Sequence, residues 1–147
     1  MSFTIEYVVA EQSQAKTLLR ERDRDASRQT IMLDPVDPFS LVALATVLEL
    51  RPGAGRNYDV DSYLPEIASD GVHGPWVLVT PNTLVTKIAA IQDSDVPKIA
   101  FRWHKENRAW DDIPIKSGDV EKILHLLRRI CRSAVEAQKP LLICLMP

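Results

Sequence analysis

The residues best suited to acid–base chemistry lie in one short stretch, FRWHKENRAWDDIPI, which spans residues 101–115. Histidine changes its protonation state near neutral pH, and a nearby carboxylate can fix the orientation of its ring. His104 could therefore serve as a general base that Asp111 or Asp112 orients, in a small hydrolase or transferase. The same side chains could equally form the polar face of a hairpin. We favour this structural interpretation, because no further catalytic group accompanies them.

Nucleophilic catalysis finds little support in the sequence. There is no G-x-S-x-G motif, in which a sharp turn exposes the serine. A reactive cysteine needs a partly exposed and electropositive environment. Cys131 lies on the apolar stripe of a predicted helix, and Cys144 lies in an apolar predicted strand. We therefore expect both thiols to pack in the core, and we expect no intrinsic enzyme activity.

Metal and phosphate sites are disfavoured as well. Segment 59–70 has acids at the first, third and twelfth places of a calcium-binding loop. Tyr63 and Leu64 occupy the places that need an oxygen ligand and a glycine, so the match fails. The sequence PGAGRN lacks the lysine of a phosphate-binding loop and follows a predicted helix rather than a strand. The histidines stand in unrelated segments, and we expect no metal and no cofactor.

Acids and large aromatic side chains occur together in the segments that we predict as loops. At binding surfaces an aromatic side chain supplies buried area, while charged side chains steer the partner. An alternative stays open, in which the aromatic residues belong to the core and solvated loops border them. The predicted binding surface consists of Tyr58, Asp59, Asp61, Tyr63, Asp70, Trp110, Asp111 and Asp112.

An acidic surface of this kind predicts a basic protein partner. The function that we infer is a non-catalytic protein-binding module, most concretely an immunity or antitoxin-type protein that neutralises a basic toxin. Arg128, Arg129 and Arg132 could instead clasp an anionic ligand. Cations in the C-terminal half of a helix are expected from the helix dipole alone, so we place them, with His125, on an exposed helix face.

The chain has the size and composition of one globular domain. Its 147 residues are 46% hydrophobic and 26% charged, which argues against a disordered chain and a membrane protein. The formal charge of −2 provides no general attraction to nucleic acid. The start, MSFTIEYVVAEQ, lacks the pattern of a signal peptide, and two cysteines in apolar segments suit a reducing compartment. We expect a cytoplasmic protein with a single domain over residues 1–147.

Hydrophobic periodicity predicts an α+β fold that positions these residues. Strands are expected at 3–9, 76–80 and 141–146, the last with two buried faces. Helices are expected at 38–50 and 118–138. Together these elements predict a small mixed β-sheet packed against several helices.

Capping signals and weaker periodicity predict three further features. Asp37 followed by proline is a good helix start, and Thr80 followed by proline predicts another. A surface helix with alternating charges is expected within residues 12–29. A short helix is expected at 62–69, inside the longest loop-like region.

Residues 96–115 admit two interpretations. Ile99, Phe101 and Trp103 alternate with polar residues, which predicts a strand that turns at KENR and returns over 109–115. The other interpretation is a helix, one face of which would carry Val96, Ile99, Ala100, Trp103 and Trp110. We favour the hairpin, because the helix leaves Phe101 outside its apolar stripe.

Three segments carry a resemblance to a known family: FTIEYVVAEQSQAKTLL, GPWVLVTPNTLVTKIAAI and LRRICRSAVEAQKPLLICLMP. In their order they resemble the small bacterial YfbM-like family. That family has an opening strand and helix, a strand that enters a helix at a Thr-Pro step, and a late helix that runs into a terminal strand. Residues 30–75 and 93–118 depart from it. The resemblance implies an α/β bacterial domain, and no functional residue is carried over.

Overall fold

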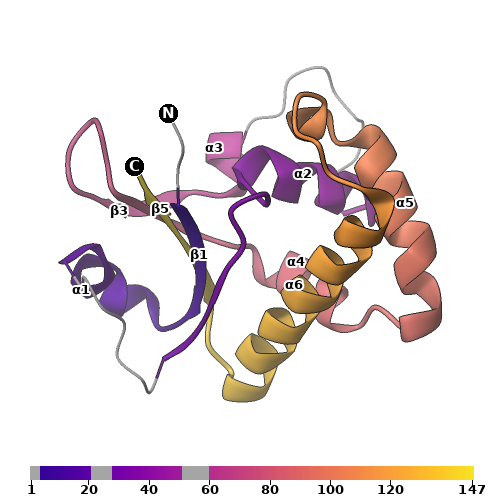
Figure 1. Cartoon of the computed structure of the whole chain (residues 1–147). Helices are drawn as coiled ribbons and strands as arrows, with labels where there is room; N and C mark the ends of the chain where they lie inside the picture. Colours follow the sequence, from indigo (N-terminus) through magenta and orange to yellow (C-terminus); the bar gives the residue numbers. More distant parts are fainter. Residues whose placement is uncertain (1–3, 21–27, 51–59) are drawn as a thin grey trace.

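Five strands form one sheet in the order β2-β1-β5-β4-β3, in a computed structural model that describes residues 4–20, 28–50 and 60–147 (Figure 1). The strands are β1 (Thr4–Val9), β2 (Gln29–Met32), β3 (Glu66–Ser69), β4 (Trp76–Val79) and β5 (Leu141–Met146). The predicted strands at 3–9, 76–80 and 141–146 are thus confirmed, and β2 and β3 are additions to the prediction.

Helices cover the sheet on both faces. They are α1 (Ala15–Arg20), α2 (Pro38–Val47), α3 (Val60–Tyr63), α4 (Asn82–Ala89), α5 (Val96–Glu106) and α6 (Ser117–Ala137). Three short 3-10 turns accompany them: η1 (Gln12–Gln14), η2 (Asp93–Asp95) and η3 (Arg108–Trp110). The α+β class predicted from the sequence is confirmed.

The sheet is antiparallel in every pairing between described strands, whereas the sequence prediction was a mixed sheet. The reason lies in the long helical excursion between β4 and β5. It leaves the sheet after Val79 and returns at Leu141, where the Thr80 N–H donates a hydrogen bond to the Leu141 carbonyl at 3.0 Å. Because the excursion begins and ends at the same end of the sheet, β5 must run opposite to β4.

The two faces of the sheet have separate cores. Ile5, Tyr7 and Ile143 belong to the larger core, which α2, α4, α5 and α6 complete. Val8 and Leu142, on the opposite face, pack in a smaller cluster with residues of α1. Alternate residues of β1 and β5 therefore serve both cores, as expected for strands buried on two faces. This confirms the prediction of an interior strand at 141–146.

Local signals explain how α2 and α6 begin and end. The Asp37 carboxylate accepts a hydrogen bond from the Ser40 N–H at 2.7 Å, so the predicted cap of α2 is confirmed. Glu49 after α2 and Gln138 after α6 have positive φ angles of 62° and 55°. Each lies where a Schellman turn closes the helix, a place that glycine normally occupies.

The hairpin expected within residues 96–115 is wrong, and the helical alternative describes this segment. Trp103 is fully buried in α5 and its indole N–H donates to the Ser40 carbonyl at 2.8 Å. Phe101, which suggested a strand, is 62% exposed. The alternation was misleading because Phe101 points to solvent and contributes nothing to the buried face of the helix.

Three other local predictions need correction. Thr80 does not cap α4: Pro81 is the N-cap residue, and no side-chain hydrogen bond caps the helix. The helix expected at 62–69 ends at Tyr63, and β3 follows because its residues pair with β4. The surface helix expected over residues 12–29 is confirmed only in part: α1 spans Ala15–Arg20, Gln29 belongs to β2, and residues 21–27 lie outside the described part.

Candidate functional site

The proposed general base His104 is half-buried on α5. Its ring faces Trp110, with ring centroids 6.4 Å apart and planes tilted by 56°. Asp111 and Asp112 are exposed in the turn after η3. No hydrogen bond or ion pair joins His104 to either acid, all three of which lie in the described part of the chain. The structure therefore does not assemble the His/Asp pair that a hydrolase of this type would need.

The described acids of the predicted binding surface are exposed, but they lie apart. Asp70 is in the turn between β3 and β4, Asp61 is in α3, and Asp111 and Asp112 precede α6. Figure 1 shows the β3–β4 turn and the segment before α6 at opposite sides of the molecule. Two further members lie outside the described residues, Tyr58 and Asp59.

The described aromatic residues of this predicted surface are buried or half-buried, unlike these acids. Trp110 is only 3% exposed, packs against Trp103, and donates its indole N–H to the Pro35 carbonyl at 2.6 Å. Trp110 as a surface anchor is therefore wrong, because its ring and its polar N–H are both used inside the domain. Tyr63 is half-buried and lines a cavity beside α4.

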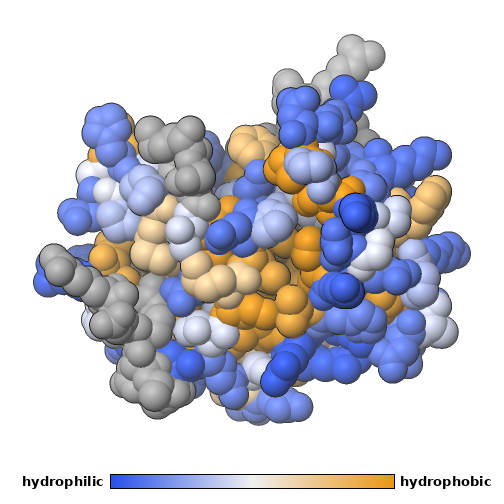
Figure 2. Space-filling view, in the orientation of Figure 1, coloured by the Kyte–Doolittle hydropathy of each residue, from blue (hydrophilic) through white to orange (hydrophobic). Residues whose placement is uncertain are grey.

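Hydrophobic side chains gather instead over α6 and the neighbouring segment that carries β2, near the middle of the face shown in Figure 2. A groove of about 410 Å³ lies between these two elements. Its apolar members are Ile31, Leu126 and Ile130, and Leu126 remains 38% exposed. Apolar patches with a polar rim are typical of binding surfaces. We call this feature the β2–α6 groove.

The rim of the β2–α6 groove is basic. Arg28 and Arg129 line it together with Gln29, Thr30 and Ser133, and no acid is among its lining residues. Arg129 is exposed on α6. The groove thus combines apolar contact area with positive charge.

The groove borders an edge strand. β2 pairs only with β1 in the described sheet, in a register that places Ile31 opposite Tyr7. The Leu33 N–H donates to the Ile5 carbonyl at 3.0 Å, and hydrogen-bonding residues alternate along an antiparallel strand. The backbone N–H and C=O groups of Thr30 and Met32 therefore point away from β1. Edge groups of this kind can pair with an added strand.

Arg128 lies on the inner side of α6, whereas the sequence placed it on the exposed face. Its side chain is buried and donates to the Ile91 carbonyl at 3.0 Å and to the Asp93 carboxylate. The guanidinium lowers the pKa of Asp93, first through this hydrogen bond and then through its charge. Arg132 donates to the Ala89 carbonyl at 2.9 Å. Both arginines thus bind backbone carbonyls at the end of α4, which the sequence pattern did not reveal.

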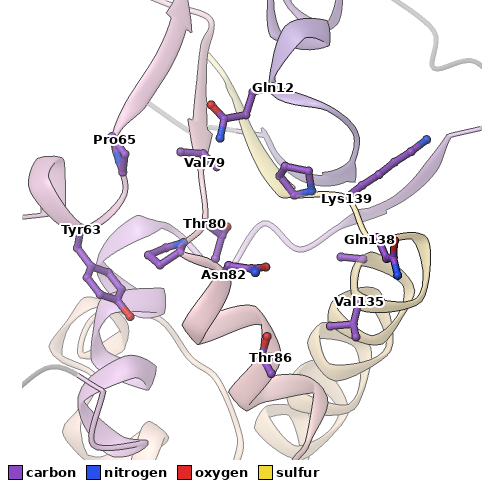
Figure 3. A pocket seen from close by; sticks show the side chains of 13 residues that line it. Gln12, Tyr63, Pro65, Val79, Thr80, Asn82, Thr86, Val135, Gln138 and Lys139 are labelled. Carbon is purple, nitrogen blue, oxygen red and sulfur yellow. The ribbon is translucent and has the colours of Figure 1, made fainter.

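A larger cavity, of about 740 Å³, lies at the start of α4 (Figure 3). Residues from β4, α4, α6 and the segment just before β5 line it, with Tyr63 on one side and Gln12 on another. Figure 3 shows Thr80 and Asn82 on the α4 side, and Gln138 at the end of α6 across from them. We call this feature the α4 cavity.

Several chemistries find no site in the described residues. Cys131 and Cys144 are buried, as predicted, and burial raises the pKa of the Cys131 thiol far above its usual value. Within residues 4–20, 28–50 and 60–147, no cluster of histidine, cysteine and acid side chains has the geometry of a metal site. None of the helices in these ranges is long and apolar enough to cross a membrane.

The residues of the β2–α6 groove were not predicted from the sequence. One signal for it was present, since Leu126 stands outside the regular apolar stripe of α6, beside Lys122 and Arg129. A large apolar residue on the polar side of a helix is a candidate surface contact. Ile31 could not have been joined to it, because 95 residues separate them — a distance along the chain that only the fold closes.

Comparison with known proteins adds no identification. No family model matches the chain, and neither does any curated protein or solved structure at a significant level. The likeness to the YfbM-like family therefore stays a resemblance in the order of elements.

Proposed function

We propose that this protein is a non-catalytic protein-binding module, of the kind that sequesters a toxin, and that it holds its partner in the β2–α6 groove. The observation that carries this proposal is the gathering of partly exposed apolar side chains, Leu126 above all, beside an edge strand and two arginines. Apolar area at the centre with a polar rim is the usual anatomy of a protein interface.

The groove selects for a particular kind of partner segment. An extended strand can add to β2 through the outward backbone groups of Thr30 and Met32. An apolar side chain of that strand fills the space between Ile31 and Leu126, and acidic neighbours pair with Arg129. Backbone pairing then supplies affinity, and the charges supply selectivity and speed of association. The partner face that fits is therefore acidic and extended.

A second surface suits the basic partner predicted from the sequence. Asp111 and Asp112 are exposed, and the adjacent Ile113 is 42% exposed. This short segment offers both negative charge and an apolar contact. We rank it second, because these residues lie in a turn between η3 and α6 and offer no edge strand with which a partner could pair.

A binding experiment with variants of each surface shows which of the two surfaces holds the partner. The purified protein is immobilised, exposed to an extract of its own cells at low and moderate salt, and the captured protein is identified and then purified. Affinity is measured for the native protein, Leu126→Asp and Arg129→Glu, and for Asp111→Lys combined with Asp112→Lys. Phe101→Asp and Lys98→Glu are matched controls, since both residues are exposed on α5.

We expect Leu126→Asp to weaken binding by about 10- to 100-fold, because it places a charge in the apolar centre of the interface. Arg129→Glu should slow association and change its salt dependence. The control variants and the Asp111/Asp112 variant should bind as the native protein does. If only the Asp111/Asp112 variant loses binding, the second surface is the site; if every variant binds equally, both are wrong.

A further inference from the structure

The lining of the α4 cavity has an apolar part and a polar part, and it carries no negative charge. Its apolar part comes from prolines and aliphatic side chains, with the ring of Tyr63 at one end. Its polar part is made of neutral amides and hydroxyls and one cation, Lys139, and no acid is among the lining residues. Such a cavity suits a ligand with an apolar body and a negatively charged end.

The start of α4 opens into this cavity. The first N–H groups of a helix have no acceptor within the helix, and here they belong to Asn82 and Thr83. No side chain caps them, since the residue at the N-cap position is Pro81. Helix N-termini with free N–H groups favour negatively charged groups, through both hydrogen bonds and the helix dipole.

Thr80 supplies an independent sign of a ligand. It lines the cavity and is only 3% exposed, and its hydroxyl oxygen has no hydrogen-bond partner among the described residues. A buried hydroxyl without a partner destabilises the folded state, whereas a valine of the same shape would not. The hydroxyl is therefore explained if an oxygen of a ligand accepts its hydrogen bond.

We propose that the α4 cavity binds a small organic anion, with its carboxylate at the start of α4 and its aliphatic body against Val79, Pro140 and the Tyr63 ring. The carboxylate accepts hydrogen bonds from the Thr80 hydroxyl and from the free N–H groups at the helix start. The site is distinct from the β2–α6 groove, because Val135 and Gln138 border it on another side of α6.

Access to Thr80 requires a local side-chain movement. The hydroxyl oxygen has almost no exposed surface of its own, whereas Asn82, at the start of the same helix, is exposed. Asn82 lies next to Thr80 in Figure 3, and we expect its side chain to move, since an exposed side chain changes rotamer rapidly. Lys139 extends away from the cavity in Figure 3, and its exposed, flexible side chain can turn toward a bound anion.

The test uses hexanoate as the probe, with hexanol and acetate as matched ligands that lack the charge or the aliphatic body. Binding is followed by the shifts of the backbone amide signals of Asn82 and Thr83 in two-dimensional NMR. We expect hexanoate to bind more tightly than either control and to shift both amides. Equal binding of hexanoate and hexanol, or no shift with any of the three, would overturn the proposal.

Thr80→Val separates ligand recognition from folding. Valine keeps the shape and removes the hydroxyl, so the variant should be at least as stable as the native protein and bind hexanoate about tenfold more weakly or worse. Thr17→Val, at an exposed position of α1 that does not line the cavity, should bind as the native protein does. Unchanged hexanoate affinity in Thr80→Val would contradict the role of Thr80. Leu126→Asp should leave hexanoate binding intact whether or not the groove binds a partner.

Discussion

The indole rings of Trp103 and Trp110 pack against each other, with centroids 4.7 Å apart and planes tilted by 47°. Each ring also donates its N–H to a backbone carbonyl, Trp103 to Ser40 and Trp110 to Pro35. These contacts therefore hold α5 and η3 against the start of α2. Trp110, which the sequence pattern placed on a binding surface, is therefore part of a structural contact with Trp103 inside the domain.

Replacing Trp110 with phenylalanine tests how much the Trp103–Trp110 contact stabilises the domain. The variant loses the N–H bond to Pro35 and part of the ring contact, so we expect a loss of stability of about 1–3 kcal/mol. Urea unfolding of Trp110→Phe, Trp103→Phe and the double variant measures both losses and their coupling. We expect the two losses to be non-additive, since the residues touch. If Trp110→Phe had the same free energy of unfolding as the native protein, the Trp103–Trp110 contact would not stabilise the domain.

The fold could be predicted from the sequence where a local structure depends on residues that are close together in the chain. Asp37 caps α2 by a contact within four residues, and the apolar stripe of α6 follows from helical spacing alone. The failure at Phe101 has the opposite cause. Whether a strand or a helix forms there depends on the pocket that Trp103 fills against α2, which short-range periodicity does not contain.

The Arg128–Asp93 contact predicts a dependence of stability on acid. The pKa of Asp93 is lower in the folded protein than its ordinary value of 3.8, so ionised Asp93 stabilises the fold. That contribution is fully present above the ordinary pKa and is lost as the pH falls through the lower, folded-state pKa. We expect Asp93→Asn to be less stable than the native protein at neutral pH and to lose less stability on acidification. Parallel stability curves from neutral to acidic pH would contradict this assignment.

The two cysteines should react slowly in the folded protein. Both are buried, and burial raises the pKa of the Cys131 thiol, so little thiolate is exposed to a reagent. We expect an aromatic disulfide reagent to label both thiols rapidly in denaturant, and in native buffer only at the rate of protein opening. Rapid labelling of native Cys131→Ser would place Cys144 at an accessible site and contradict its burial in β5.

Glycine at the ends of α2 and α6 should stabilise the domain. Glu49 and Gln138 have left-handed backbones, which cost about 1–2 kcal/mol for residues with a side chain and almost nothing for glycine. We expect Glu49→Gly and Gln138→Gly each to raise the free energy of unfolding by up to about 1 kcal/mol, since glycine also loses more entropy on folding. Thermal melting of each variant measures this change in stability. Ala137→Gly is the control, and it should destabilise because it lies within α6.

The candidate sites were less predictable than the fold, for a physical reason. The predicted acids are exposed, as acids in loops usually are, but exposure alone does not bring Asp70 near Asp111. The β2–α6 groove joins Ile31 to Leu126, and the α4 cavity joins Tyr63 to Gln138. Surfaces of this kind are built from several elements, so they follow only from the way that the elements pack.

The proposed partner site is tested most directly by hydrogen exchange of the backbone amides, measured for the free protein and for its complex with the purified partner. An added strand on β2 should slow exchange of the outward amides of Thr30 and Met32, and contact with the groove should also slow exchange around Leu126. Asp111–Ile113 should exchange at the same rate in both states. Slower exchange at Asp111–Ile113, with β2 and the Leu126 region unchanged, would contradict binding in the β2–α6 groove.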